Sequence, residues 1–357
     1  MNTRFFEFKK NIFISDILQH LNITKEFFYK TNEKLDQKII DNKIEKLSSF
    51  KFLSENTLSF LSQIPNKIHP MQSGICLVKN DNLSLLPVSL IKIPISNPKL
   101  AFANLIELFC KKKIETNPTY INNNNTLIST SAKIGKNVKI GPFAVIKNNV
   151  VVGDNVTIDE RVTISENCIV GKNSKIKSGV FLECSVLEEN VTINQNSVIG
   201  KEGFGFFPNK EDTKVFTHIG GVLISKNSNI GSNCNIDRGF LEDTFLGKSV
   251  MIDNQVHVAH NCKIGNYCIL AGKSALSGSV VLEDEVILGG DVGIVDNVVI
   301  GEKSIISAAS KVFKNFPKNS KIGGYPAQNL YDWQRILVYN NRNLKNLETN
   351  INTTYDI

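Results

Sequence analysis

The sequence predicts a mainly β protein built as a parallel β-helix of hexapeptide repeats, with an N-terminal α+β domain and a C-terminal helix. The main observation is an aliphatic residue that recurs every six positions through most of the chain. A period of six fits neither an α-helix nor a long alternating strand, whereas three hexads in each 18-residue coil stack their aliphatics into one core. The two ends of the chain lack this repeat, so we expect them to fold differently.

The repeat is longest between Leu246 and Val312, where twelve consecutive hexads carry Leu, Ile or Val. An earlier stretch begins at Ile134 and slips by one residue at Leu187. Two positions before each of the twelve aliphatics, the residue is small or β-branched, which suits a tight corner between stacked short strands.

Four of the seven cysteines fall in this restricted position, so we interpret them as small core residues and not as metal ligands. They are Cys168, Cys234, Cys262 and Cys268. The chain has no CxxC pair and an odd number of cysteines, which argues against a disulfide framework and a zinc ribbon and favours a reducing cytosol.

The period breaks at residues 201–217, which must loop out of the coil. This segment contains Glu202-Gly203-Phe204-Gly205-Phe206-Phe207. Two glycines between aromatic residues indicate a lid or pocket wall, and a loop simply packed on the coil is the alternative.

The compositional changes predict four regions: an α+β domain (1–116), a linker (117–130), the coil (131–323) and a helical extension (324–357). The first region holds eleven of the 21 phenylalanines and an amphipathic helical pattern over residues 100–113. In the extension, five residues follow heptad spacing and predict a helix that needs a partner, self-association being the simplest. These are Leu330, Trp333, Leu337, Leu344 and Leu347.

The formal net charge of +7 does not predict nucleic-acid binding, because the basic residues are scattered. We interpret the abundance of Lys and Asn as compositional bias. No apolar run of about 18 residues predicts a transmembrane helix, and residues 1–10 do not resemble a signal peptide. We therefore expect a cytoplasmic protein.

His260 is the main candidate for chemistry. His257 and His260 both lie outside the core phase, so both should project outward. One coil beyond His260 lies Gly278, and a glycine beside an outward histidine leaves a notch where a backbone N–H can face a ligand. Acyl transfer needs such a pair, an imidazole base and an oxyanion donor. Asp253 is either a support for the imidazole or a turn residue, and His257 is interpreted as a surface histidine.

A zinc site of three histidines, as in the β-helix class of carbonic anhydrases, is the competing enzyme hypothesis. A spacing of three points His257 and His260 in different directions, and His218 lies beside the interrupted region. We therefore expect no metal.

The motifs around these residues resemble those of the UDP-3-O-acylglucosamine N-acyltransferases of lipid A (lipopolysaccharide) biosynthesis. The resemblance is close over residues 130–335 and loose in the first domain. Its motifs are Asn235-Ile236-Asp237-Arg238-Gly239, Ile252-Asp253-Asn254-Gln255, Ala259-His260-Asn261, Ser277-Gly278-Ser279, Gly324-Tyr325-Pro326-Ala327 and the Gly203-Phe204-Gly205 loop.

This resemblance implies a left-handed coil and a homotrimer with active sites between subunits, in the cytoplasm of a Gram-negative bacterium. It implies that a 3-hydroxyacyl chain passes from acyl carrier protein to the 2-amine of UDP-3-O-(3-hydroxyacyl)glucosamine. The C-terminal helices would help to bind the carrier, whose phosphopantetheine brings the acyl group, and no cofactor is bound by the enzyme. His260 matches the general base, Asp253 a supporting carboxylate, and Gly278 the oxyanion N–H donor.

The chain departs from the family at two substrate positions. The second histidine of the family falls on Asn297, which retains an amide donor. Phe60 matches an aromatic that stacks on uracil, but a second aromatic is missing from Gln63–Ile68, and Phe60 is alternatively a core residue. Phe204 and Gly205 match the substrate loop. The rival hypotheses are a UDP-N-acetylglucosamine O-acyltransferase, disfavoured by the domain order, and a non-catalytic β-helix scaffold.

Overall fold

The computed structural model describes residues 1–32, 36–65, 68, 72–114, 118–123, 125–207 and 213–352. The chain divides into two compact units. The N-terminal unit comprises Met1–Pro118, Glu202–Gly221 and Arg238–Asp243, and the coil unit comprises Thr119–Lys201, Val222–Asp237 and Thr244–Ile357. The end of the expected first domain (115–116), parts of the expected linker (117 and 124) and the end of the tail (353–357) lie outside the described residues.

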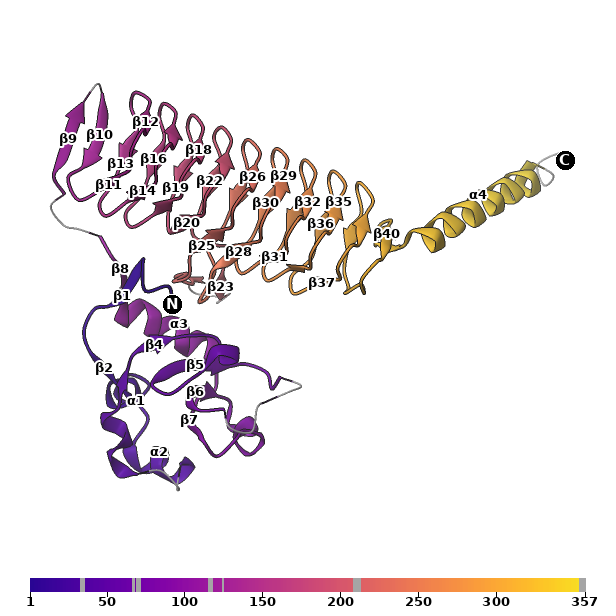
Figure 1. Ribbon diagram of the computed structural model, residues 1–357. Helices are drawn as coiled ribbons and strands as arrows, with labels where there is room; N and C mark the ends of the chain where they lie inside the picture. Colours follow the sequence, from indigo (N-terminus) through magenta and orange to yellow (C-terminus); the bar gives the residue numbers. More distant parts are fainter. Residues whose placement is uncertain are drawn as a thin grey trace. The chain divides into compact units, whose positions relative to one another are not determined.

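The coil unit is a ladder of short strands (Figure 1). Most hexads form a strand of two residues, and strands 18 residues apart pair in parallel, as Met251 does with Ile269. Only the middle of each hexad is therefore extended, and the remaining residues turn the corners. This architecture confirms the predicted fold class of a hexapeptide-repeat β-helix.

The coil strands form three sheets. The first sheet contains β9 (Tyr120–Asn123), β10 (Thr126–Ser129), β13 (Val145–Ile146), β16 (Thr163–Ile164), β19 (Phe181–Leu182), β22 (Val198–Ile199), β27 (Asn235–Ile236), β30 (His257–Val258), β33 (Ala275–Leu276), β36 (Gly293–Ile294) and β39 (Lys311–Val312). The second contains β11 (Lys133–Ile134), β14 (Val151–Val152), β17 (Ile169–Val170), β20 (Ser185–Leu187), β25 (Val222–Ile224), β28 (Thr244–Leu246), β31 (Lys263–Ile264), β34 (Val281–Leu282) and β37 (Val299–Ile300). The third contains β12 (Lys139–Ile140), β15 (Thr157–Ile158), β18 (Lys175–Ile176), β21 (Thr192–Ile193), β26 (Asn229–Ile230), β29 (Met251–Ile252), β32 (Ile269–Leu270), β35 (Ile287–Leu288), β38 (Ile305–Ile306), β40 (Lys321–Gly323) and β41 (Gln328–Asn329).

The core of the coil consists of the residues that the repeat predicted. All twelve aliphatics from Leu246 to Val312 are at most 5% exposed. The four cysteines of the restricted position are 0% exposed, which confirms that they are core residues. Each coil therefore stacks its aliphatics on those of the next, and neighbouring coils bury one another.

The corners explain why the coil is rich in asparagine. At most corners, the third residue after the aliphatic has a positive φ, for example Asn137 (56°), Asn155 (58°) and Asn261 (63°). Asparagine tolerates this conformation better than most residues other than glycine. The interpretation of Asn abundance as compositional bias is therefore wrong for the coil, because the residue has a conformational role there.

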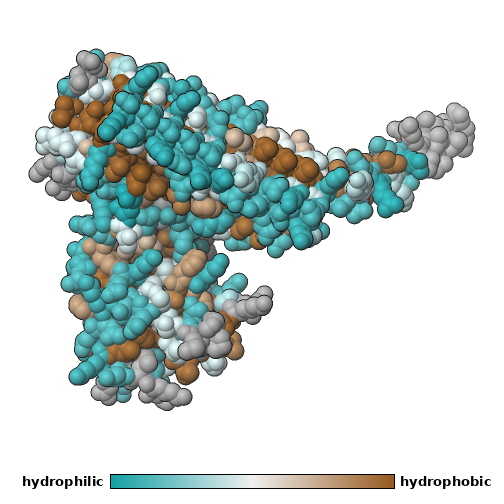
Figure 2. Space-filling model, in the orientation of Figure 1, coloured by the Kyte–Doolittle hydropathy of each residue, from teal (hydrophilic) through white to brown (hydrophobic). Residues whose placement is uncertain are grey.

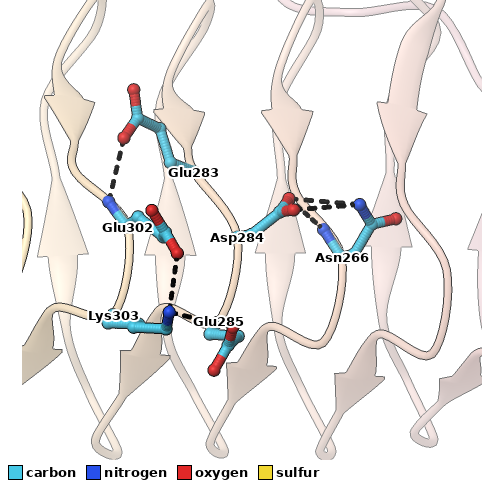
Figure 3. A network of polar contacts seen from close by, with 6 residues as sticks. All are labelled: Asn266, Glu283, Asp284, Glu285, Glu302 and Lys303. Carbon is cyan, nitrogen blue, oxygen red and sulfur yellow. Dashed lines mark hydrogen bonds and ion pairs between the residues drawn. The ribbon is translucent and has the colours of Figure 1, made fainter.

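Side chains from one coil satisfy corner N–H groups of the coil before it. On the second sheet, Asn266 Oδ1 accepts from the Lys248 N–H (2.9 Å), and Asp284 Oδ1 accepts from the Asn266 N–H (2.8 Å). Farther along the direction is reversed, because Glu283 Oε2 accepts from the Glu302 N–H of the coil after it (2.9 Å; Figure 3). These bonds link successive coils at half-buried or exposed positions, and the ion pair of Lys303 with Glu302 lies beside them.

The N-terminal unit contains a four-stranded parallel sheet with helices. The sheet has the order β4 (Lys46–Leu47), β5 (Thr57–Leu61), β6 (Gly74–Val78) and β7 (Leu90–Pro94). The other elements are β1 (Phe6–Phe8), β2 (Ile12–Phe13), α1 (Ile14–His20), α2 (Lys25–Thr31), β3 (Lys43–Ile44), α3 (Pro98–Phe109), β8 (Cys110–Lys112), β23 (Phe206–Phe207), β24 (Lys214–Val215) and three 3₁₀ turns (Gln37–Asp41, Phe50–Phe52 and Asn80–Leu85).

Helix α3 is shorter than the pattern over residues 100–113 predicts. It begins after Asn97, whose side chain accepts from the Leu100 N–H, and it has Pro98 in its first turn. It ends at Phe109 because Cys110–Lys112 pair with β1 as an antiparallel strand. The pairing partner lies about 100 residues away in the sequence, so a local pattern does not reveal it.

Two excursions leave the coil and belong to the N-terminal unit. The first, Glu202–Gly221, contains the break in the period that the sequence predicted, and its strands β23 and β24 pair antiparallel. The second, Arg238–Asp243, accounts for the longer step between Ile236 and Leu246.

After the last coil, β41 pairs antiparallel with β40 and the chain continues as α4 (Leu330–Asn352). The predicted heptad positions Leu337 and Leu344 are 42% and 58% exposed. The side chain of Leu347 lies outside the described ones.

Hydrophilic residues cover much of the molecular face drawn in Figure 2, with hydrophobic patches between them. In the described parts of the chain, no helix is long and apolar enough to cross a membrane.

Candidate active site

His260 lies at a corner of the first sheet, two residues after the buried Val258 of β30, and it is half-buried. Its Nδ1 lies 3.0 Å from Oδ1 of Asn261. An amide oxygen only accepts hydrogen bonds, so with this assignment of the amide the proton sits on Nδ1. Nε2 then carries the lone pair that a general base needs.

Gly278 stacks on His260 as the sequence predicts. The Ser279 N–H donates to the carbonyl oxygen of His260 (2.9 Å), which places Gly278 one coil beyond it. A Cβ atom on Gly278 would lie 2.6 Å from Cε1 and 2.8 Å from Nε2 of the imidazole. The ring therefore occupies the space that a side chain would fill, and only glycine permits this arrangement.

The N–H of Gly278 is not capped by a side chain, unlike the corner N–H groups of Lys248 and Asn266 on the second sheet. Among the described residues it donates to no acceptor, and the same holds for the N–H of Asp284 at the same position of the second sheet; the Asn266 N–H, one coil before Asp284, donates to Asp284 Oδ1. A backbone N–H beside an imidazole base is the donor that a tetrahedral oxyanion requires. The catalytic roles of the two residues themselves remain predictions.

Asp253 forms no hydrogen bond or ion pair with His260 within the described part of the chain. Its Oδ2 accepts from the Gly272 N–H (3.1 Å), on a corner of the third sheet. A direct supporting contact with the imidazole is therefore absent from these described residues, and Asn261 occupies Nδ1 instead. The predicted support by Asp253 stays a prediction.

Asn297 follows Asp296, which lies one coil beyond Gly278 at the same corner position as His260. Its N–H donates to the carbonyl oxygen of Gly278 (3.0 Å), and its Nδ2 donates to Oδ2 of Asp296 (2.9 Å). Both side chains are exposed. Asn297 is thus two coils beyond His260, and its amide is oriented by the neighbouring carboxylate.

His257 belongs to a different polar group on the same sheet. Its Nε2 lies 3.9 Å from Oδ2 of Asp237, a carboxylate that is 1% exposed. Oδ1 of Asp237 forms an ion pair with the Lys201 ammonium, with 3.0 Å between Oδ1 and Nζ. The histidine is 44% exposed, which agrees with its interpretation as a surface residue.

The predicted nucleotide and loop residues lie in the N-terminal unit. Phe60 is half-buried, with its ring 5.0 Å from that of Phe102 and 6.4 Å from that of Phe240. Phe204 is 79% exposed and contacts Phe206 at 4.9 Å between ring centroids.

Gly205 packs closely on the buried His218, because a Cβ there would lie 2.9 Å from its Cε1. Nδ1 of His218 lies 2.9 Å from the carbonyl oxygen of Phe216, so this histidine is part of the packing.

The thiols are unsuited to nucleophilic chemistry. Burial raises the pKa of Cys262 to about 12 and that of Cys268 to about 11, which leaves almost no thiolate at neutral pH. Within the described residues, no three His, Cys, Asp or Glu side chains come together in a group that could hold a metal ion.

Sequence reasoning did not single out two residues of the site. Asn261 was visible only as part of the Ala259-His260-Asn261 motif, and its hydrogen bond with Nδ1 needs the corner geometry. Asp296 lies two coils from His260, 36 positions along the sequence, so counting in coils would have found it.

These features define the class of the protein as a hexapeptide-repeat β-helix with an imidazole and a glycine notch at one corner. The family model for bacterial transferase hexapeptide (six repeats) matches residues 243–278, and that for the GMPPB C-terminal domain matches residues 122–203. A solved structure of Arabidopsis UDP-N-acetylglucosamine acyltransferase has a TM-score of 0.52 and 24% identity over 58% of this chain and 73% of that one. At this identity the likeness concerns the fold alone.

Within this class, the chain is similar to proteins named UDP-3-O-acylglucosamine N-acyltransferase. The protein of Saccharophagus degradans is 41% identical over 227 residues, which are 62% of this chain and 64% of the relative. The protein of Rhizobium meliloti is 35% identical over 161 residues, 45% of this chain and 46% of the relative. The matched stretches therefore cover less than two thirds of either relative. They confirm the resemblance that the motifs indicate.

Proposed function

We propose that this protein transfers a 3-hydroxyacyl chain from acyl carrier protein to the 2-amine of UDP-3-O-(3-hydroxyacyl)glucosamine, a step of lipid A biosynthesis. The observation that carries the proposal is the imidazole of His260 lying over Gly278, next to a backbone N–H without an acceptor among the described residues. The names of the relatives support the choice of substrates.

In the proposed mechanism, the amine nitrogen attacks the carbonyl carbon of the thioester. Nε2 of His260 takes the proton that the nitrogen loses as the new C–N bond forms. The negative charge on the carbonyl oxygen is stabilised by the N–H of Gly278, and the tetrahedral intermediate collapses by breaking the C–S bond. The carrier leaves as a thiolate, which the imidazolium or water protonates, so the products are an amide and a thiol.

Asn261 holds the tautomer that this step requires. Its Oδ1 accepts from Nδ1–H, which keeps the lone pair on Nε2 facing the notch at Gly278. Asp253 acts at a distance in this proposal, because its Oδ2 accepts from the Gly272 N–H and so fixes that corner.

For the nucleotide, we propose Phe60 as the stacking residue for uracil, because its ring is half-exposed in a cluster of aromatic side chains. Phe204 and Gly205 would line the acyl substrate, since a phenyl ring that is 79% exposed is available for an apolar ligand. Asn297 would donate a hydrogen bond from its amide to the substrate.

We further propose that the active form is a homotrimer. Four apolar residues repeat at 18-residue spacing along the third sheet and are 37–46% exposed: Met251, Ile269, Ile287 and Ile305. Such an exposed stripe and the exposed seam of α4 are suited to self-association. The net charge of +7 favours the acidic carrier protein and the diphosphate substrate, in the reducing cytoplasm where seven buried free thiols are stable.

The test is to incubate the purified protein with UDP-3-O-acylglucosamine and 3-hydroxyacyl carrier protein and to follow product mass. We expect the acceptor to gain one hydroxyacyl group with the wild type and to lose most of that gain with His260→Ala. Acylation of UDP-N-acetylglucosamine instead would identify an O-acyltransferase. No product with either acceptor would favour a non-catalytic scaffold.

A further inference from the structure

Two coils beyond His260, the same corner position holds Asp296, a carboxylate that the mechanism above does not use. The Ser279 N–H donates to the carbonyl oxygen of His260, and the Asn297 N–H donates to that of Gly278. This register places His260, Gly278 and Asp296 at the same corner position of three successive coils. Because the middle residue has no side chain, no Cβ separates the imidazole from the Asp296 corner.

Asp296 is not used as a cap for the coil before it. On the second sheet, Asp284 occupies the same position of its hexad one coil earlier and accepts from the N–H of Asn266, whereas Glu302, in the coil of Asp296, does not cap the N–H of Asp284 among the described residues. Asp296 instead accepts from Nδ2 of its neighbour Asn297 at 2.9 Å and is exposed. The corner N–H that it would cap, that of Gly278, has no acceptor among the described residues.

The spacing of the column suits an amino group. Neighbouring coils are separated by about 4.8 Å, the ordinary distance between paired strands. The imidazole already covers Gly278, so about one such step remains between the ring and the Asp296 corner. A nitrogen that donates to acceptors on both sides, at about 2.9 Å each, needs them less than about 6 Å apart.

We propose that Asp296 binds the amino group of the acyl acceptor and selects amines over hydroxyls; this inference rests on the proposed function. An amine has two N–H groups, so it donates one to Nε2 of His260 and one to the Asp296 carboxylate while its lone pair faces the thioester. A hydroxyl has a single O–H and satisfies only one of the two acceptors. The carboxylate also attracts the protonated form of the amine before His260 removes its proton.

The test is calorimetric binding of UDP-3-O-acylglucosamine and of its analogue with a hydroxyl in place of the 2-amine, which requires no turnover. We expect the wild type to prefer the amine, Asp296→Ala to bind it about three- to tenfold more weakly with the hydroxyl analogue unaffected, and Asp296→Asn to lie between them. Glu285→Ala is the matched control, an exposed acid on the second-sheet corner, and should bind both ligands as the wild type does.

Equal affinities for both ligands in the wild type, or an unchanged amine affinity in Asp296→Ala, would overturn the inference. So would a lower melting temperature for Asp296→Ala with unchanged binding, because it would identify the carboxylate as a structural cap. Failure of the proposed function has a different signature, namely normal amine binding without acyl transfer from the carrier protein.

Discussion

Corners on two sheets of the coil have equivalent backbones but differ in whether a side chain accepts from the corner N–H. On the second sheet, the side chains of Asn266 and Asp284 each accept a hydrogen bond from a corner N–H of the coil before them. On the first sheet, the equivalent positions hold His260 and Gly278, and the Gly278 N–H meets no acceptor within the described residues. The comparison shows that glycine leaves the first-sheet corner without the capping side chain that Asp284 supplies on the second sheet, and our proposal places the reaction in the space that this leaves.

The largest effect is expected from adding a methyl group at the notch. Gly278→Ala would place Cβ 2.6 Å from the imidazole of His260, so the ring must move and is misaligned for taking the proton from the substrate amine. We expect kcat to fall by about 100-fold or more in the mass assay. Gly290→Ala is the control, since a Cβ there meets nothing closer than 3.4 Å, and it should remain fully active. An active Gly278→Ala enzyme would remove the distinction between the two corners.

Asn261→Ala tests whether the reactive corner depends on the tautomer of His260. Loss of the acceptor for Nδ1–H frees the ring to rotate and to carry its proton on Nε2, so we expect kcat to fall about 10- to 100-fold with KM little changed. Asn155→Ala removes an asparagine with a similar φ from a distant corner. Asn155→Ala should lose a similar amount of stability, because alanine is strained at this φ, and should leave kcat unchanged. An equal loss of kcat in both variants would assign the effect to folding.

Asp284→Ala examines the structural corner. The substitution removes the acceptor for both the N–H and Nδ2 of Asn266. Since the site is only half-buried, we expect a loss of about 1–2 kcal/mol in the free energy of unfolding, with kcat unchanged. Chemical denaturation followed by circular dichroism measures this value. A stability equal to that of the wild type would mean that water replaces the cap at no cost.

The smallest effect concerns the thiol beneath the reactive corner. Cys262 is 0% exposed, and burial raises its pKa to about 12. At pH 8 we expect less than about one thiol in a thousand to be ionised, so iodoacetamide should leave the native protein unmodified and label it after unfolding. Rapid labelling of Cys262 in the folded protein, detected by peptide mass, would show that this corner opens.

The repeat made most of the coil predictable, because each buried aliphatic has one position in the hexad. The stacking of His260 on Gly278 was also predictable, because the two residues are 18 positions apart, which is one coil. Contacts between strands that are far apart in the sequence were harder to predict. The pairing of Cys110–Lys112 with β1, which ends α3 early, joins opposite ends of the N-terminal unit. The partners of His260 and Asp253 depended on which way each side chain turns at its corner, and the sequence pattern carries no information on rotamers.

The most direct test compares His260→Ala with Asp284→Ala for both acyl transfer and unfolding free energy. We predict that His260→Ala loses at least about 100-fold in kcat and keeps the stability of the wild type, whereas Asp284→Ala keeps kcat and loses about 1–2 kcal/mol. Wild-type transfer activity in His260→Ala would contradict the assignment of the reactive corner.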